Sequence, residues 1–132
     1  MKYFLLLIFL LPITVYSQII ISKDSLTPPS DFTNIHVQKI AGDSLVSTFV
    51  IFIKENVPLH KHQYHSENVL ILEGEGTMTL GAITKEIKAG DIIFVPANTF
   101  HEVKVTSEKP LKVISIQAPE FDGTDRVPYL KN

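Results

Sequence analysis

The sequence predicts an all-β protein that folds as one antiparallel sandwich or barrel. Short apolar runs rich in Val, Ile, Phe and Thr recur at regular spacing, and turn residues separate them. No stretch keeps the 3.6-residue periodicity that an amphipathic helix requires. The chain has 132 residues, which suits a single domain, and its 45% hydrophobic residues are enough for one packed core.

Charge and cysteine content exclude several classes of protein. The chain carries 12 Lys+Arg and 14 Asp+Glu, a formal net charge of -2, and its basic residues form no cluster. We therefore expect no nucleic-acid partner, because such proteins need a basic patch to neutralise phosphates. The absence of Cys excludes disulfides, thiolate zinc sites and cysteine nucleophiles.

Residues 1–17 have the features of a secretory signal peptide. Lys2 provides the positive start, Tyr3 to Leu11 form an unbroken apolar stretch, and Ser17 ends a small-x-small pattern. Pro12 interrupts the apolar run before it reaches the ~20 residues that a membrane-spanning helix needs. We expect cleavage after Ser17, an exported protein that is periplasmic or secreted, and no stable membrane insertion. An uncleaved anchor and a buried strand are the alternatives.

The mature chain is expected to begin with an extended arm over residues 18–34, because this segment is polar and contains two adjacent prolines. The first two strands are expected at residues 35–40 and 45–53. Both are rich in β-branched and apolar residues, and the Ala-Gly-Asp sequence at residues 41–43 is typical of a turn between strands.

Glycines separate the next three expected strands. The third, residues 68–72, ends before the Gly-Glu-Gly sequence at 74–76, where a turn is expected. The fourth, residues 77–80, is separated by Gly81 from the fifth, residues 83–87.

The last three strands are expected at residues 92–95, 101–106 and 111–117. Pro96 ends the first of them, and Lys109–Pro110 separates the other two. Because side chains alternate between the two faces of a strand, one face of each strand near the C-terminus is predicted to point inward. The side chains on these inward faces are Glu67, Val69, Ile71, His101, Val103, Val105, Leu111, Val113, Ser115 and Gln117, with Lys112 on the outer face.

Histidines gather in one short segment and supply the strongest functional pattern. In an extended strand His60 and His62 project to the same face, so both imidazoles can approach one point. Glu67 can return on the neighbouring strand and His101 arrives from a distant one. Three imidazoles and one carboxylate suit Fe(II), Mn(II), Ni(II), Cu(II) or Zn(II). A surface histidine cluster with His101 as an ordinary core residue is the alternative.

These residues resemble the first motif of the cupin superfamily. That motif, Gly-x5-His-x-His-x(3,4)-Glu-x6-Gly, is matched by His60, His62, Glu67 and Gly74. Lys54 replaces its first glycine.

The second cupin motif, Gly-x5-Pro-x-Gly-x2-His-x3-Asn, is matched by Gly90, Pro96 and His101. Asn98 replaces the internal glycine, and Asn tolerates the positive φ that Gly would supply. Val105 replaces the final asparagine, which makes the expected pocket more apolar.

The resemblance implies a cupin double-stranded β-helix, a jelly-roll-like antiparallel barrel, over residues 35–118, followed by a tail or lid over residues 119–132. It implies one divalent transition-metal ion (Fe, Mn, Ni, Zn or Cu) at these four side chains and a small-molecule substrate. Cupins include dioxygenases, isomerases, epimerases, lyases and sugar-binding modules. We expect an enzyme acting on a small oxygen-rich substrate, either a dioxygenase or a sugar or uronate isomerase, epimerase or lyase, with a non-catalytic module that binds a sugar or metal as the alternative. Homodimers are frequent among cupins, and the sequence is compatible with one.

Two residues of the predicted turn after His62 are candidate catalytic groups. His65 is a candidate proton shuttle, because its unperturbed pKa lies near neutrality. Tyr64 is a candidate phenolic acid. A solvated turn histidine and rim packing are the respective alternatives, and Tyr64 and Phe100 would be the aromatic platforms of a sugar-binding module.

Candidate substrate-binding residues come from the last strand and the tail. Gln117 and Ser115 could orient substrate or a metal-bound water through hydrogen bonds. Arg126 could bind a substrate carboxylate if the tail folds over the barrel mouth. The alternative is that Arg126 pairs with Asp122 or Asp125 and that the tail caps one end of the sandwich.

Overall fold

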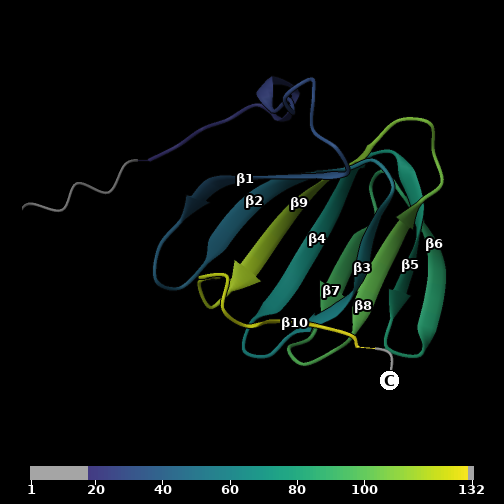
Figure 1. Ribbon diagram of the computed structural model, residues 1–132. Coiled ribbons are helices and arrows are strands. Elements are labelled where there is room, and N and C mark those ends of the chain that lie inside the picture. The colour runs from purple at the N-terminus through teal and green to yellow at the C-terminus, as the bar shows by residue number, and fades with distance from the viewer. Residues whose placement is uncertain (1–17, 131–132) are drawn as a thin grey trace, which may run out of the picture.

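The computed structural model describes residues 18–130, which form two five-stranded antiparallel sheets packed face to face (Figure 1). The prediction of an all-β barrel is therefore confirmed. Before the sheets lies one short 3-10 turn, η1 (Lys23–Ser25). The strands are β1 (Ile35–Gly42), β2 (Ser47–Ile53), β3 (Asn56–His62), β4 (Ser66–Glu73), β5 (Glu75–Leu80), β6 (Ile83–Lys88), β7 (Ile92–Val95), β8 (His101–Val105), β9 (Leu111–Ala118) and β10 (Arg126–Pro128).

The order of the strands leaves one side of the sandwich open. One sheet has the order β1-β2-β9-β4-β7 and the other β10-β3-β8-β5-β6. Short connections join β2 to β3, β4 to β5, β6 to β7 and β8 to β9, so four of the five strand positions of one sheet are joined to their counterparts in the other, including the edge pair β6 and β7. The edge pair at the other end, β1 and β10, has no such connection in the described part of the chain. The edges of β1 and β10 therefore flank the open side.

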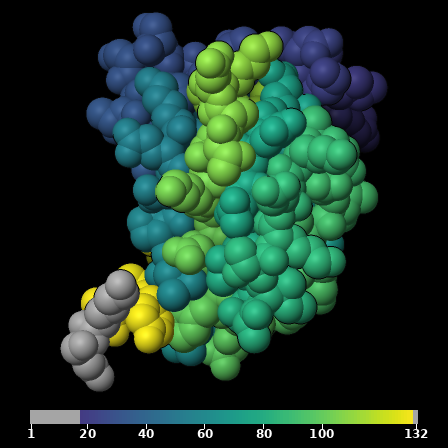
Figure 2. All heavy atoms as spheres, turned by 90° about the vertical axis from the view of Figure 1, so that its right-hand side faces the viewer, coloured from purple at the N-terminus to yellow at the C-terminus, as the bar shows by residue number. Residues whose placement is uncertain are grey.

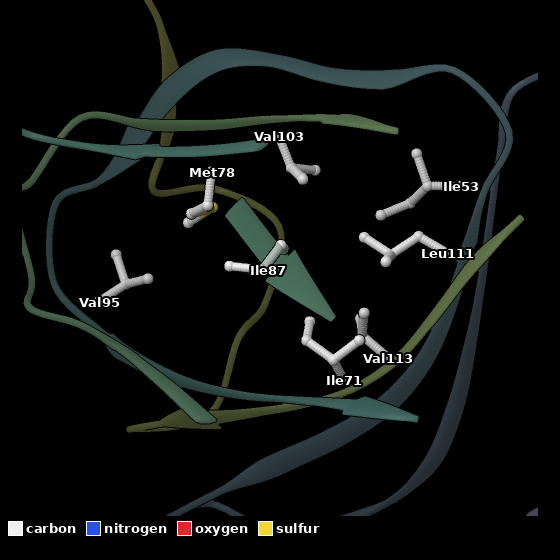
Figure 3. Packing of buried hydrophobic residues seen from close by; sticks show 8 residues of the cluster. All are labelled: Ile53, Ile71, Met78, Ile87, Val95, Val103, Leu111 and Val113. Atoms are coloured by element: carbon white, nitrogen blue, oxygen red, sulfur yellow. The ribbon is translucent and has the colours of Figure 1, made fainter. Parts of the chain in front are cut away.

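The core lies between the sheets and follows the alternation expected from the sequence. Figure 3 shows buried side chains from both sheets pointing toward one another. The inward positions of β8 and β9 are buried as predicted, including the polar residues His101, Ser115 and Gln117, and Val105 is partly buried. The hydrophobic cluster drawn in Figure 3 consists of Ile53, Ile71, Met78, Ile87, Val95, Val103, Leu111 and Val113.

Two strands were not predicted from the sequence. In β3 the apolar pattern is interrupted by polar and charged side chains and by Pro58, which lies where the pairing with β8 shifts register between Val57 and His60. β10 has only three residues, and it exists because the tail returns to pair with β3, with Arg126 opposite His62. Neither strand carries the short-range signature of an apolar run.

The N-terminal arm is part of the packed structure and is not only an extended linker. Leu26 is buried against Val50 and Phe52 on the outer face of the β1-β2-β9 half of the first sheet. Lys112, on the same outer face, is also buried, and its ammonium group donates to the backbone carbonyl of Lys23 (2.8 Å) and to Glu73 Oε1 (3.2 Å). The arm thus covers a second, smaller apolar cluster.

The backbone has a positive φ at several positions of the cupin-like motifs, including Gly74 and Asn98. Gly74 has φ +84°, and a Cβ atom there would lie 2.9 Å from Leu111 Cα. Asn98 has φ 61°, which is the conformation that an internal glycine would supply. Its backbone N–H donates to the carbonyl of His62, so this residue ties the loop before β8 to the end of β3.

The arm and the C-terminal tail lie at opposite ends of the molecule. Figure 2 shows the arm at the top and the tail at the bottom. Among residues 18–130 there is no helix with the length and apolar content needed to cross a membrane.

Candidate metal centre and cavity

Three buried histidines meet between the sheets. β3 supplies His60 and His62, two positions apart on the same face, and β8 supplies His101, which is the direct cross-strand partner of His60. One nitrogen from each of the three rings lies within 4.8 Å of the others. The closest ring centroids, those of His60 and His101, are 4.2 Å apart.

Each of these rings is oriented by a hydrogen bond at Nδ1. A neutral imidazole that donates through Nδ1 keeps its lone pair on Nε2, where it can bind a metal ion. The three Nε2 atoms are therefore available as ligands. The acceptors are the carbonyl of Pro58 for His60 (2.8 Å), the carbonyl of Thr99 for His101 (3.0 Å) and Asp125 Oδ1 for His62 (3.3 Å).

Glu67, on β4, completes the group. Its Oε2 atom lies 3.6 Å from His101 Nε2. Its Oε1 atom accepts hydrogen bonds from Ser115 Oγ and from Gln117 Nε2, the latter at 3.2 Å. One carboxylate oxygen is thus held by β9, and the other faces the histidines.

Burial disfavours the protonated forms of His60 and His62. Burial and, after it, the neighbouring His101 imidazole lower the pKa of His60 to about 3. Burial also lowers the pKa of His62, followed by the effect of His65. At neutral pH the rings of His60 and His62 are therefore uncharged. A metal ion can bind at Nε2 without displacing a proton.

The donor set fits a divalent transition metal. Imidazole nitrogens and one carboxylate suit Fe, Mn, Ni, Zn and Cu, and the protein has no thiolate to favour a closed structural zinc site. The convergence of three free Nε2 atoms beside a restrained carboxylate supports this fit.

A cavity of about 410 Å³ extends from the histidines into the barrel. His60, His62, Glu67, His101, Gln117 and Arg126 line its polar end. Its remaining walls are mostly apolar, and seven of the eight residues labelled in Figure 3 contribute to them. The polar groups are thus concentrated at one end of an apolar chamber.

The mouth of the cavity lies on the open side of the sandwich. Four residues that line the cavity are themselves exposed: Ile35 and Val37 on β1, Arg126 on β10, and Pro58 on β3, the strand that pairs with β10. β1 and β10 are the two strands at this edge, and within residues 18–130 no short connection joins them. A ligand can therefore reach the histidines between β1 and β10.

The candidate catalytic residues His65 and Tyr64 do not line this cavity. Tyr64 is 72% exposed. His65 is buried and is not the solvated turn residue of the alternative interpretation: its ring stacks beside that of His62 with centroids 4.0 Å apart. His65 Nδ1 lies 2.9 Å from Asp125 Oδ2.

The candidate substrate-binding residues take different positions. Gln117 and Arg126 line the cavity, whereas Ser115 lies behind Glu67 and supports it. Within residues 18–130 Arg126 forms no ion pair with Asp122 or Asp125, so the alternative pairing is not observed. Burial lowers the pKa of the Arg126 guanidinium, and Glu67 opposes that effect.

Asp125 is the main site residue that sequence reasoning missed. It was considered only as a partner for Arg126, yet its carboxylate contacts both His62 and His65. The two histidines are about sixty positions away in the sequence, and no local pattern indicates that the tail returns to them. Phe121, whose ring lies 5.4 Å from that of His62, was missed for the same reason.

Comparisons with known proteins give the family and the fold of this chain. A family model described as "Cupin domain" matches residues 49–117. A protein of Aquifex aeolicus is 33% identical over 93 residues, which are 70% of this chain and 76% of that protein. Quercetin 2,3-dioxygenase of Bacillus subtilis is 35% identical over 60 residues, 46% of this chain but only 18% of the enzyme. A double-stranded β-helix protein from Klebsiella pneumoniae has a similar structure, with a TM-score of 0.71 at 21% identity, covering 85% of this chain and 97% of that protein.

Proposed function

This chain belongs to the cupin family, and from that premise we propose that it is a metal-dependent enzyme acting on a small molecule. His60, His62, Glu67 and His101 would hold one divalent transition-metal ion. The observation that carries the proposal is the convergence of three buried imidazoles, each hydrogen-bonded at Nδ1, at the polar end of an accessible cavity. A substrate bound to the metal ion would occupy this cavity.

The walls of the cavity indicate the shape of the substrate. A sugar presents hydroxyl groups on all sides, and most of them would face hydrocarbon in this chamber, at a cost in lost hydrogen bonds. A molecule with an apolar body and paired oxygens at one end would match both the walls and the metal centre. Gln117 and Arg126 lie where they can bind and orient that oxygen-bearing end.

Bound Fe(II) would support dioxygenation, whereas Mn(II), Ni(II) or Zn(II) would act as a Lewis acid in isomerisation, epimerisation or elimination. The apolar walls and the likeness to quercetin 2,3-dioxygenase favour the first of these chemistries.

The alternative of a sugar-binding module receives less support. Its aromatic platforms would be Tyr64 and Phe100, and neither of them lines the cavity. Phe100 packs instead against Tyr129 of the tail, with ring centroids 5.3 Å apart.

The proposal is tested by metal analysis of the protein expressed from its full-length gene and purified without chelators. A variant with His60→Ala and His62→Ala is analysed in parallel. We expect near-stoichiometric metal in the wild type and its loss in the variant. The metal-loaded protein is then mixed with catechol, an aromatic vicinal diol, and with galacturonate. The catechol should bind more tightly, and oxygen uptake should follow if the metal is iron.

Two results would contradict the proposal. Absence of metal after reconstitution with Fe(II), Mn(II), Ni(II), Cu(II) and Zn(II) at neutral pH would exclude the four-residue site. Metal binding with a preference for galacturonate would retain the site but reject the apolar substrate.

We further propose that residues 1–17, which lie outside the described residues, direct export to the periplasm or medium. The positive start, the apolar stretch and Ser17 support this proposal. The same preparation tests it, because the mass of the purified protein should correspond to a chain beginning at Gln18. A cytosolic protein that retains Met1 would contradict it.

A further inference from the structure

Asp125 is a buried carboxylate in an otherwise exposed turn. Only 4% of its surface is accessible, whereas Asp122, Gly123, Thr124 and Arg126 are all exposed. Burial by itself would raise the pKa of this carboxyl, but hydrogen bonds from the backbone N–H groups of Tyr64 and His65 outweigh it and the pKa is lowered. Because two backbone N–H groups donate to this carboxyl group, it acts as a hydrogen-bond acceptor at this position.

The two carboxylate oxygens have different partners. Oδ2 accepts from the backbone N–H of Tyr64 (3.0 Å) and of His65 (3.3 Å) and lies 2.9 Å from His65 Nδ1. Oδ1 lies 3.3 Å from His62 Nδ1. One oxygen thus holds the turn that follows β3, and the other contacts a proposed metal ligand.

The backbone of the tail places this carboxylate firmly. β10 pairs with β3 through Arg126 opposite His62, and the N–H of Gln63 donates to the carbonyl of Asp125 (3.0 Å). Asp125 is therefore fixed to the strand that carries His60 and His62.

We propose that Asp125 is a positioning residue that keeps the proton of His62 on Nδ1 and so leaves Nε2 free to bind the metal ion. This inference rests on the proposed metal site. His60 and His101 obtain the same orientation from backbone carbonyls of their own segments, whereas His62 obtains it from a side chain of the C-terminal tail. The tail is thus a component of the metal centre.

Asp125→Asn separates this role from that of a structural anchor. The amide oxygen can replace Oδ2 and accept the same backbone N–H groups, which keeps the turn. The amide NH₂ group then faces His62 Nδ1, and two donors cannot share that contact. His62 is expected to move its proton to Nε2, the tautomer that cannot bind a metal ion.

The test compares the wild-type protein with Asp125→Asn, Asp125→Ala and a control, Asp122→Asn. Asp122 lies in the same turn but is exposed, and the hydrogen bonds of its side chain within residues 18–130 are both to Thr124. Long-range ¹H–¹⁵N spectra of the metal-free proteins report the tautomer of His62. Competition with a chelator gives the dissociation constants for Zn²⁺ and Co²⁺, and thermal unfolding reports stability.

We expect the Nδ1–H tautomer in the wild type and the control, and the Nε2–H tautomer in Asp125→Asn. Metal binding by Asp125→Asn should be about 10- to 100-fold weaker, with a melting temperature close to that of the wild type. Asp125→Ala should lose both metal affinity and stability, because the turn also loses its acceptor.

An unchanged tautomer and unchanged metal affinity in Asp125→Asn would overturn the inference and leave Asp125 as an anchor of the turn alone. Failure of the wild type to bind metal would overturn the proposed function, and with it the metal-binding part of this inference. The tautomer comparison needs no metal, so the two failures are distinguishable.

Discussion

At the scale of single residues, the candidate centre depends on polar side chains whose own partners are satisfied. Ser115 is fully buried, and its hydroxyl donates to Glu67, while Gln117 donates to both of them. A carboxylate in a low-dielectric interior requires such donors. Glu67 therefore keeps one orientation, with Oε2 facing the histidines.

Ser115→Ala should weaken metal binding up to about tenfold, because Glu67 loses its closest donor and gains freedom to turn away. The dissociation constant for Zn²⁺, measured by chelator competition, checks this expectation. Ser44→Ala is the matched control, because Ser44 is exposed in the turn between β1 and β2. Equal affinities in the two variants would show that Glu67 does not depend on Ser115.

The residues of the centre were predictable to different degrees. The alternation of side chains in a strand places His60 and His62 on one face, and the structure brings Glu67 and His101 to them. Nothing comparable indicates Asp125, whose contacts depend on the path of the tail through space. Tyr64 was a candidate because of its position in the turn, and sequence position alone does not determine whether a turn side chain points inward.

At the scale of elements, the N-terminal arm contributes to stability through a few specific contacts. Leu26 fills an apolar site beside Val50 and Phe52, and Lys112 holds the backbone at Lys23. The arm was expected to be an extended linker because its composition is mostly polar. Its buried residue, Leu26, is an isolated apolar position in the sequence and gives no recognisable pattern. β3 was missed for a related reason, since its inward positions are histidines and not hydrocarbon.

Leu26→Ala should lower the free energy of unfolding by about 2 to 3 kcal/mol, because it removes a buried side chain from the outer cluster. Ile20→Ala, in the same arm, is the control and should have almost no effect, since Ile20 is fully exposed. Urea denaturation of both variants checks the difference. A similar loss in both would indicate that the arm does not dock through Leu26.

At the scale of the whole molecule, the arrangement of connections determines where the barrel opens. In the two sheets, each strand faces a counterpart. Short connections join four of these five facing pairs, and the pair formed by β1 and β10 is not joined in this way in the described part of the chain. The all-β class followed from residue composition and turn spacing, whereas the open side depends on which strands pair. Long-range pairing leaves no local trace in a sequence, so this side could not be predicted.

Val37→Trp should slow the entry of catechol into the metal-loaded protein several-fold, because a bulky ring would narrow the mouth beside β1. Val37 is 52% exposed and lines the cavity. Ile92→Trp is the control, since Ile92 is 75% exposed on β7 at the closed side. Stopped-flow measurement of association checks the prediction, and equal rate constants in both variants would place the mouth elsewhere.

The position of Asp125 after strands β1 to β9 has a consequence for the order of assembly. Ribosomes synthesise these strands before residues 125–128, and a secretion channel delivers them in the same order. His62 gains its partner only after residues 125–128 have joined β3. If the protein is exported as proposed, the centre becomes complete outside the cytosol, and the protein takes its metal from the ions available there.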